Sequence, residues 1–308
     1  MKYDIIGKRK IFYIISGITI VLSLAALTLW GLKLGIDFTG GSLWEFRFKN
    51  DSPAGVEKLK IEETLRSQIQ GELLVQKSSE GIFSVRTKEL TEAEHQNLAS
   101  SLRAVSSDFE ELRFEAIGPT VGKTLQTKSI QAIVMVILGI SIYITYAFRQ
   151  ASRPVASWKY GLATIFTLFH DVVIPIGVFA WLGEFKHIEV DVNFVTAILV
   201  VMGFSVHDTI VVFDRIREKI RISNTKNFIE LVNLGLNETL VRSFNTSLTA
   251  ILALAAVYFW GSYTLQYFIL AMLIGIGVGV YSSIAIASPM IVEFWLRQQK
   301  KSQASKSK

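Results

Sequence analysis

The chain has 308 residues, of which 50% are hydrophobic and 19% are charged, and its mean hydropathy is +0.40. Soluble domains carry about 25% charged residues, so this composition excludes an ordinary soluble domain and indicates a membrane protein. The chain contains no cysteine, which excludes disulfides and thiolate metal sites.

We predict six membrane-spanning helices, each from an apolar stretch near the required length of about 20 residues. The first stretch continues past the small residues Ser23 and Ala25 and is longer than a secretory signal core. We therefore expect a retained anchor. The turn-forming residues 260–264 divide the last long uncharged stretch into two spans. The predicted spans are 11–32, 128–149, 159–183, 191–214, 237–260 and 264–294.

Lysine and arginine are concentrated in the segments that flank these spans on one side of the membrane. Short basic segments remain in the cytoplasm, so both termini are expected there. The net charge of +6 then reflects topology and attraction to anionic lipid, rather than binding to nucleic acid. The predicted cytoplasmic segments are 1–10, 150–158, 215–236 and 295–308.

Residues 33–127 are hydrophilic and lie between the first two spans, which predicts a folded domain on the outer, periplasmic side. Alternation of apolar and polar residues predicts strands, and spacing of three to four residues predicts helices. Thr91 and Glu94 form a capping box that begins the second helix. The order βαββαβ predicts a ferredoxin-like α+β domain. The strands are expected at 42–48, 72–77, 82–87 and 108–118, and the helices at 53–69 and from Thr91 onward.

The stretch IGPTVGKTL, residues 117–125, has some features of a phosphate-binding loop. That motif requires four residues between its first glycine and the Gly-Lys-Thr triplet, whereas only three separate Gly118 from Gly122. We therefore exclude a phosphate loop. Gly118 and Pro119 are interpreted as a hinge between the outer domain and the second span.

Ionisable residues within spans are costly to bury, so they indicate functional sites. Asp208 lies about 10 Å inside the end of its span marked by Arg215. Asp171 is expected nearer the middle of the membrane. If the fifth helix begins near Leu234, Arg242 can reach the depth of Asp208 and form a switchable pair with it. A buried structural ion pair is the alternative.

Several neighbouring polar residues are candidates for coupling or proton relay. His170 and His207 each precede an acid, but consecutive helical residues are expected to point in different directions. Hydroxyls and amides near Arg242 could hold water or join helices by hydrogen bonds. Gly275 and Gly279 have the spacing for close helix packing. The coupling or relay candidates are Asp214, His207, Asn245 and Thr246.

An enzyme is not expected, because the chain has no nucleophile–base pair, metal-ligand cluster or cofactor loop with the required spacing. One outer loop contains residue types that bind metals, but we interpret it as a solvated loop and expect no metal site. Its residues are Glu184, His187, Glu189 and Asp191.

Four long motifs carry a resemblance to a known family. They are LGIDFTGGSLWEF at 34–46, IGPTVGKTL at 117–125, GFSVHDTIVVFDRIRE at 203–218 and ETLVRSFNTSLTA at 238–250. With six spans and one large outer loop, the chain closely resembles the SecF subunits of the SecD/SecF family. These subunits look like one half of a resistance-nodulation-division transporter.

The resemblance implies a subunit that works with SecD and the SecYEG channel, using the proton gradient to complete preprotein export across the bacterial inner membrane. YajC is a further implied partner, and protons are the implied coupling ion, with no cofactor. By position, Asp208 corresponds to the family's proton-pathway acid and Arg242 to its conducting arginine. Asp171 aligns with a polar position of the third span. The chain is too short for a fused SecD–SecF polypeptide, so a separate SecD is implied.

Two other functions remain open. One is half of a proton-driven exporter of small molecules or lipids, which would keep Asp208 and Arg242 but need an outer pocket for apolar molecules. The other is a non-transporting scaffold of a membrane complex. Replacement of Asp208 with asparagine distinguishes a scaffold, which should keep working, from a proton-driven machine, which should fail.

Overall fold

The computed structural model describes the chain except for residues 1–2, 49–57, 70, 72, 78–80, 150–153, 223–226 and 307–308. Two compact units make up the structure. The helical unit comprises Met1–Lys33 and Gln131–Lys308. The second unit, which we call the outer unit after its predicted location, comprises Leu34–Ile130.

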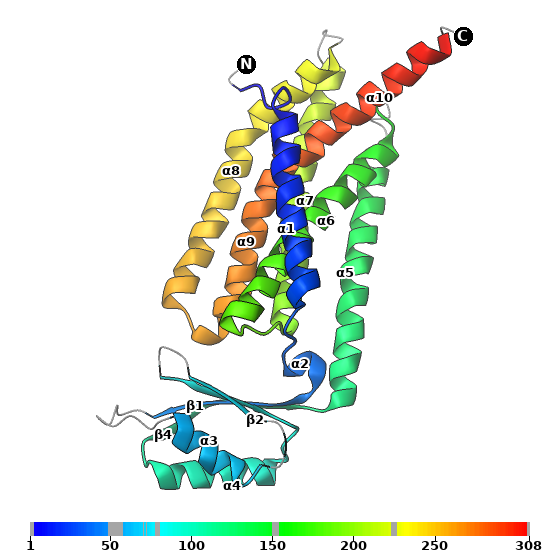
Figure 1. The fold of residues 1–308 in the computed structure, drawn as a ribbon. Coiled ribbons are helices and arrows are strands. Elements are labelled where there is room, and N and C mark those ends of the chain that lie inside the picture. Colours follow the sequence, from blue (N-terminus) through cyan, green and yellow to red (C-terminus); the bar gives the residue numbers. More distant parts are fainter. Residues whose placement is uncertain are drawn as a thin grey trace. The chain divides into compact units, whose positions relative to one another are not determined.

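The helical unit is built from long apolar helices (Figure 1). Six helices in the described part of the chain are long and apolar enough to cross a membrane, as predicted. Helices suit this environment because they satisfy their backbone hydrogen bonds internally. They are α1 (Arg9–Trp30), α5 (Pro119–Ala147), α6 (Ser157–Lys186), α7 (Val192–Ile222), α8 (Phe228–Trp260), and α9 (Gln266–Ser282), which continues through a π-helical segment (Ser283–Ala287) into α10 (Ser288–Lys306).

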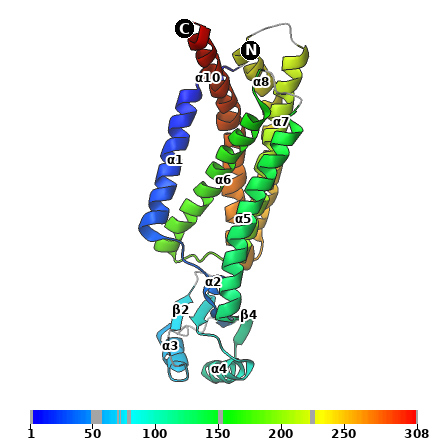
Figure 2. The same cartoon turned by 90° about the vertical axis from the view of Figure 1, so that its right-hand side faces the viewer.

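Helices α6, α7 and α9 pack against one another, while α1 packs on α6, and α8 packs on α7 and α9 (Figures 1 and 2). Close packing of α9 on α7 depends on the two glycines predicted for it. A β-carbon on Gly275 would lie 2.5 Å from Val201 Cγ2, and one on Gly279 would lie 2.9 Å from Ser205 Cβ. The absence of side chains at these positions lets the two helices approach.

The charged residues around Asp214 lie in the last turns of α7, beyond its apolar part. Helix α7 continues to Ile222, and α8 begins at Phe228, so both extend into the segment 215–236 that was predicted as a connector. Asp214 pairs with Arg217, and Arg215 pairs with Glu218. Pairs at this spacing support a helix in water. Hydropathy therefore predicts where the apolar part of a helix ends, whereas the helix itself can continue beyond that point.

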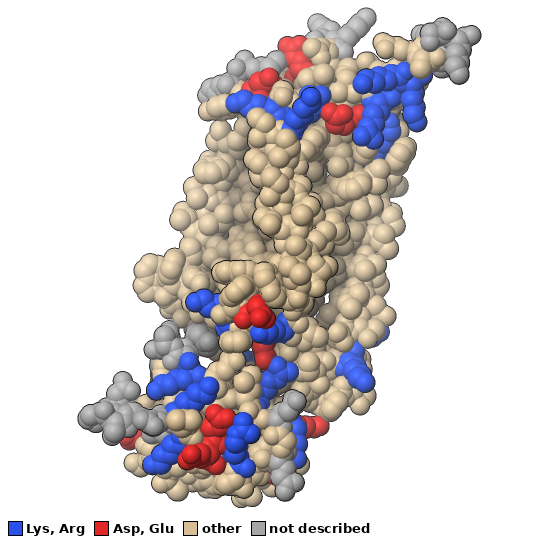
Figure 3. All heavy atoms as spheres, in the orientation of Figure 1, with Lys and Arg blue, Asp and Glu red and all other residues tan. Residues whose placement is uncertain are grey.

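The same reasoning applies to the last span, which was predicted to end at residue 294, whereas α10 continues to Lys306. Figure 3 shows charged side chains gathered at the end of the helical unit that carries both chain termini. Along the middle of these helices, the described atoms on the face in view belong to uncharged residues. This distribution is the one expected of a membrane-spanning bundle.

The outer unit has the predicted βαββαβ order. Its sheet has the strand order β2-β3-β1-β4, and all three neighbouring pairs are antiparallel. This is the ferredoxin-like arrangement. After a short helix α2 (Ile36–Thr39), the elements are β1 (Gly41–Phe48), α3 (Lys58–Arg66), β2 (Leu73–Lys77), β3 (Phe83–Thr87), α4 (Glu92–Val105) and β4 (Phe109–Ile117).

The core of the outer unit lies between the sheet and its two longer helices. Alternation along β1 buries Trp44 and Phe46, which pack with apolar residues of α3 and α4 such as Leu65 and Leu102. The capping box of Thr91 and Glu94 is formed as predicted. The first predicted helix, 53–69, is seen over Lys58–Arg66, and its early part lies outside the described residues.

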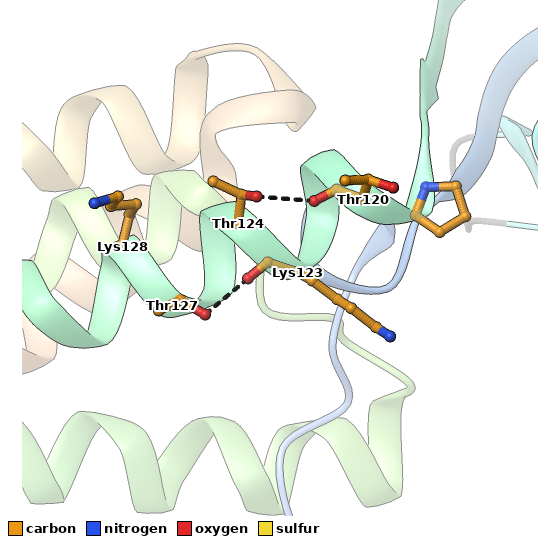
Figure 4. Close-up of a pocket in the computed structure, with 6 residues that line it drawn as sticks. Thr120, Lys123, Thr124, Thr127 and Lys128 are labelled. Atoms are coloured by element: carbon orange, nitrogen blue, oxygen red, sulfur yellow. Dashed lines mark hydrogen bonds between the residues drawn. The ribbon is translucent and has the colours of Figure 1, made fainter.

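Helix α5 begins at Pro119, before the start predicted at residue 128. Proline suits the first turn of a helix, because the missing N–H would have no helical partner there. The Gly-Lys-Thr triplet at 122–124 therefore lies inside a helix. In Figure 4, Thr124 Oγ1 donates to the Thr120 carbonyl at 2.9 Å, and Thr127 Oγ1 donates to the Lys123 carbonyl at 3.0 Å. This regular helical surface differs from the loop that cradles phosphate.

Candidate functional site

Asp208 lies on the face of α7 that meets α8. Its side chain is buried, with 2% of the residue exposed. Ser247 Oγ of α8 donates to Asp208 Oδ2 at 3.3 Å. Among the described residues, this buried acid thus has a direct hydroxyl partner on the neighbouring helix.

Arg242 lies on the exposed side of α8 in this chain. Among the residues that the structure describes, Asp208 and Arg242 form no ion pair, so the alternative of a structural ion pair is not seen here. A switchable pair, which opens and closes, stays a prediction. Ser247 contacts Asp208 because it lies on the inward face of α8. Arg242 lies five residues earlier, about 140° around a regular helix.

Asp171 is more deeply enclosed than Asp208, with 0% of the residue exposed. Its Oδ2 accepts hydrogen bonds from Ser205 Oγ of α7 at 2.5 Å and from Ser282 Oγ of α9 at 2.7 Å. His170 Nδ1 lies 2.9 Å from Asp171 Oδ1. The three central helices therefore meet at one carboxylate.

The contact between His170 and Asp171 corrects an expectation from the sequence. Consecutive helical residues were expected to point apart, yet these two side chains touch. The physical reason is reach: the Cα–Cβ bonds diverge, but a ring nitrogen and a carboxylate oxygen can turn back toward each other across one residue. His170 Nε2 is buried and has no hydrogen-bond partner among the described residues.

Ser282 and Ser283 are functional candidates that the sequence reasoning missed. Ser283 Oγ lies 3.0 Å from Thr209 Oγ1, and it also donates to the Ser205 carbonyl at 3.3 Å. Ser282 ends α9, and the π-helical segment begins at the next residue. Ser283 thus contacts α7 directly. The adjacent Ser282 bonds to Asp171, which also accepts a hydrogen bond from Ser205 of α7. The signal in the sequence that could have identified them was a pair of hydroxyl side chains inside an otherwise apolar span.

The remaining candidates do not join this cluster. His207, Asn245 and Thr246 are exposed in this chain, and Thr246 Oγ1 donates to the carbonyl of Arg242 at 2.9 Å. Asp214 is exposed and paired with Arg217. These four residues lie outside the buried network of Asp171 and Asp208.

The loop that contains Glu184, His187 and Asp191 has residue types that can bind metals, but these side chains contact protein groups instead. Lys33 Nζ lies 3.3 Å from both Glu184 Oε2 and His187 Nδ1. Asp191 Oδ1 accepts from the backbone N–H of Phe194 at 2.8 Å at the start of α7. In the described part of the chain, no group of three or more histidines or acids is arranged to hold a metal ion.

Comparison with known proteins places these features in one family. The family model for the C-terminal part of the SecD/SecF protein export membrane proteins matches residues 97–297, and the SecD/SecF GG motif matches residues 31–51. The chain is 42% identical over 303 residues to the protein translocase subunit SecF of Thermobaculum terrenum, covering 94% of this chain and 93% of that protein. It is 33% identical to the subunit of the same name from Haemophilus influenzae, covering 94% and 86%.

A solved structure shows the same architecture. The crystal structure of SecDF, a translocon-associated membrane protein from Thermus thermophilus, matches with a TM-score of 0.80 and 29% identity. The match covers 95% of this chain but only 38% of the SecDF chain. Given the family matches, the relatives and this shared fold, the chain belongs to the SecD/SecF family of protein export membrane proteins.

Proposed function

We propose that this chain is a proton-driven subunit of the Sec translocase, which works with SecD to complete the export of preproteins across the inner membrane. The observation that carries the proposal is the buried carboxylate of Asp208 at the contact between α7 and α8. Intramembrane acids of this kind serve proton pathways in pumps and transporters. The chain performs no covalent chemistry in this role, and protons are the coupling ion.

The proposed assembly contains SecD, the SecYEG channel and YajC, with unfolded preproteins as substrates. The name SecF, shared by relatives that match nearly the whole chain, supports a place in the Sec system. Both termini lie in the cytoplasm in this proposal. The basic residues at the end of the helical unit that carries both termini support that orientation (Figure 3).

The proposed cycle begins with protonation of Asp208. A neutral acid attracts Ser247 and an approaching Arg242 less strongly than a carboxylate does. Helices α7 and α8 then tilt relative to each other, and the outer unit moves about the hinge at Gly118 and Pro119. Asp171 is the second acid of the pathway. The proposed coupling residues are Asp214, His207, Asn245 and Thr246.

The test uses the full chain in its complex, in inner-membrane vesicles that hold a preprotein trapped partway through the channel. Forward movement of the preprotein is measured with and without a proton gradient. The parent should move its substrate faster with the gradient, and Asp208→Asn should lose that difference while its complex stays assembled. Equal responses of the parent and Asp208→Asn would contradict proton coupling and favour a scaffold.

A matched control lies one turn from Ser247 on the same helix. Ser243 is buried, and its Oγ has no hydrogen-bond partner among the described residues. Ser243→Ala should therefore respond to the gradient like the parent. Ser247→Ala, which removes the hydroxyl bonded to Asp208, should alter the response.

A further inference from the structure

We infer that His170 and Asp171 form a second proton-binding site, whose state is passed to α7 and α9 by Ser205 and Ser282. The inference deepens the proposed function and rests on it. It assigns His170 Nε2 as the atom that takes up the proton, and it assigns the two serines as positioning residues.

The contacts of Asp171 suit the ionised form of its carboxyl group. A carboxylate that is out of water needs hydrogen bonds or a charged partner to keep its charge. Asp171 has 0% exposure, receives two hydroxyl hydrogen bonds at Oδ2, and has an imidazole nitrogen 2.9 Å from Oδ1. Protonation of this carboxyl would remove the charge that makes these hydrogen bonds strong.

His170 supplies the site with an open position for a proton. Because Nδ1 faces a carboxylate oxygen, the neutral ring carries its proton on Nδ1 and leaves Nε2 as an acceptor. Nε2 is buried and has no hydrogen-bond partner among the described residues, and the ring is 2% exposed. A proton bound at Nε2 would create an imidazolium beside Asp171, which could then pass a proton to the acid.

Few other ionisable groups are near this ring in the described structure. Tyr281 of α9 is stacked with the His170 ring at a centroid distance of 6.1 Å, and its hydroxyl donates to the Phe12 carbonyl of α1 at 2.9 Å. On α7, the acid on the same face as Ser205 is Asp208, three residues further along. Tyr281 is therefore the ionisable group in ring contact with His170, and Asp208 shares the face of α7 that carries Ser205.

The serines connect the pair to the rest of the bundle. Ser205, Asp208 and Thr209 lie on one face of α7, at spacings of three and four residues. Ser283, the first residue of the π-helical segment, contacts Thr209 and the Ser205 carbonyl of this face, whereas Ser282, the last residue of α9, bonds to Asp171 of α6. Release of Ser205 and Ser282 from a protonated Asp171 would free α7 and α9 to shift against α6. That shift would reach the face that carries Asp208.

Ser282 and Ser283 stand at the junction between α9 and the π-helical segment. Adjacent residues of a regular α-helix are separated by about 100° around its axis. The π-helical turn that begins at Ser283 has a wider backbone hydrogen-bonding pattern. The side chain of Ser288 also donates, through Oγ, to the Ser283 carbonyl at 3.4 Å. Single π turns inside α-helices frequently occur at functional sites.

The test measures the protonation of Asp171 directly. The full complex in vesicles is treated with dicyclohexylcarbodiimide, which modifies protonated carboxyl groups in apolar surroundings, across a series of pH values. Mass spectrometry quantifies the modified peptide that contains Asp171. Loss of one hydrogen bond to a carboxylate should shift the midpoint of labelling upward by about one pH unit in Ser282→Ala. Ser282→Thr, which retains the hydroxyl, should restore the parental midpoint.

Ser283→Ala is the matched control, because Ser283 is equally buried and does not contact Asp171. It should leave the midpoint of Asp171 unchanged. If Ser282→Ala fails to assemble, Ser205→Ala removes the other hydroxyl bond and should give the same upward shift. An unchanged midpoint in an assembled Ser282→Ala or Ser205→Ala complex would overturn the inference.

A second variant separates the role of His170 Nε2 from that of Nδ1. His170→Asn keeps an N–H donor for Asp171 but removes the second ring nitrogen. The gradient response should fall at least tenfold, and the labelling midpoint should stay within about one pH unit of the parent. A retained response would exclude Nε2 as the proton acceptor. Loss of the response in Asp208→Asn with no labelling shift in Ser282→Ala would leave the proposed function intact and reject this inference alone.

Discussion

Gly122 of α5 lies against the backbone of Gly40 in the outer unit. A β-carbon on Gly122 would stand 3.0 Å from the Gly40 nitrogen and 3.0 Å from the Phe38 carbonyl oxygen. Gly40 has a φ angle of +76°, and a β-carbon there would stand 2.8 Å from Pro119 Cα. The start of α5 is therefore packed directly on the turn between α2 and β1. Any hinge motion at Gly118 and Pro119 would have to open this contact.

Gly122→Ala should destabilise the outer unit by about 1 to 3 kcal/mol, because backbone atoms cannot swing away from the added methyl group. Thermal unfolding of the full chain in detergent measures the loss, and hydrogen exchange should show weaker protection near residue 40. Gly139→Ala, on the same helix with nothing within 4 Å, is the control. It should be neutral or slightly stabilising. Equal losses in the two variants would contradict the close contact.

Gly275→Ala should weaken the packing of α9 on α7 by about 1 to 3 kcal/mol. The new methyl group would meet the side chain of Val201, which is stiff because it is branched at Cβ. Gly277 lies two residues away with nothing within 4 Å of its β-carbon position. The thermal midpoint of the full chain in detergent should fall for Gly275→Ala only. A similar fall for Gly277→Ala would point to a general effect of removing glycine.

Glu94→Gln should lower the stability of the outer unit at neutral pH. Hydrogen bonds from the backbone and side chain of Thr91 hold the pKa of Glu94 below its usual value. A lowered pKa in the folded state means that the carboxylate stabilises the fold above the unfolded-state pKa, and that this contribution disappears as pH falls through the folded-state value. Thermal unfolding of the two proteins should therefore converge in acid. A difference that is constant with pH would show that the charge of Glu94 has no part in the cap.

Glu45→Gln should raise the stability of the outer unit at neutral pH. Burial raises the pKa of Glu45, Arg113 acts against that rise, and Glu115 adds to it. A raised pKa in the folded state means that protonation stabilises the fold, and that this contribution is lost as pH rises through the folded-state value. The variant should unfold at a higher temperature than the parent near neutral pH, and the advantage should vanish in acid. Glu63→Gln, at an exposed position of α3, should change the midpoint little at either pH.

Local patterns in the sequence were sufficient to predict the spans and the outer domain. Hydropathy and length located all six membrane helices, and the alternation along β1 located the buried Trp44 and Phe46. The capping box of Thr91 and Glu94 was also predicted. These features depend on residues close together in the chain, so the sequence carries them directly. The cost of burying charge likewise identified Asp171 and Asp208 as candidates before any contact was known.

The tertiary structure alone decided which side chains meet. It placed Ser282 on Asp171 and Ser247 on Asp208, left Arg242 on the exposed side of α8, and brought Gly122 against Gly40. Each of these relationships depends on the rotation of one helix about its axis and on its depth against a neighbour. Those two quantities are set by packing between segments far apart in the chain. Successive residues of a helix are separated by about 100° around its axis, so a rotation of that size replaces one contacting side chain with its neighbour.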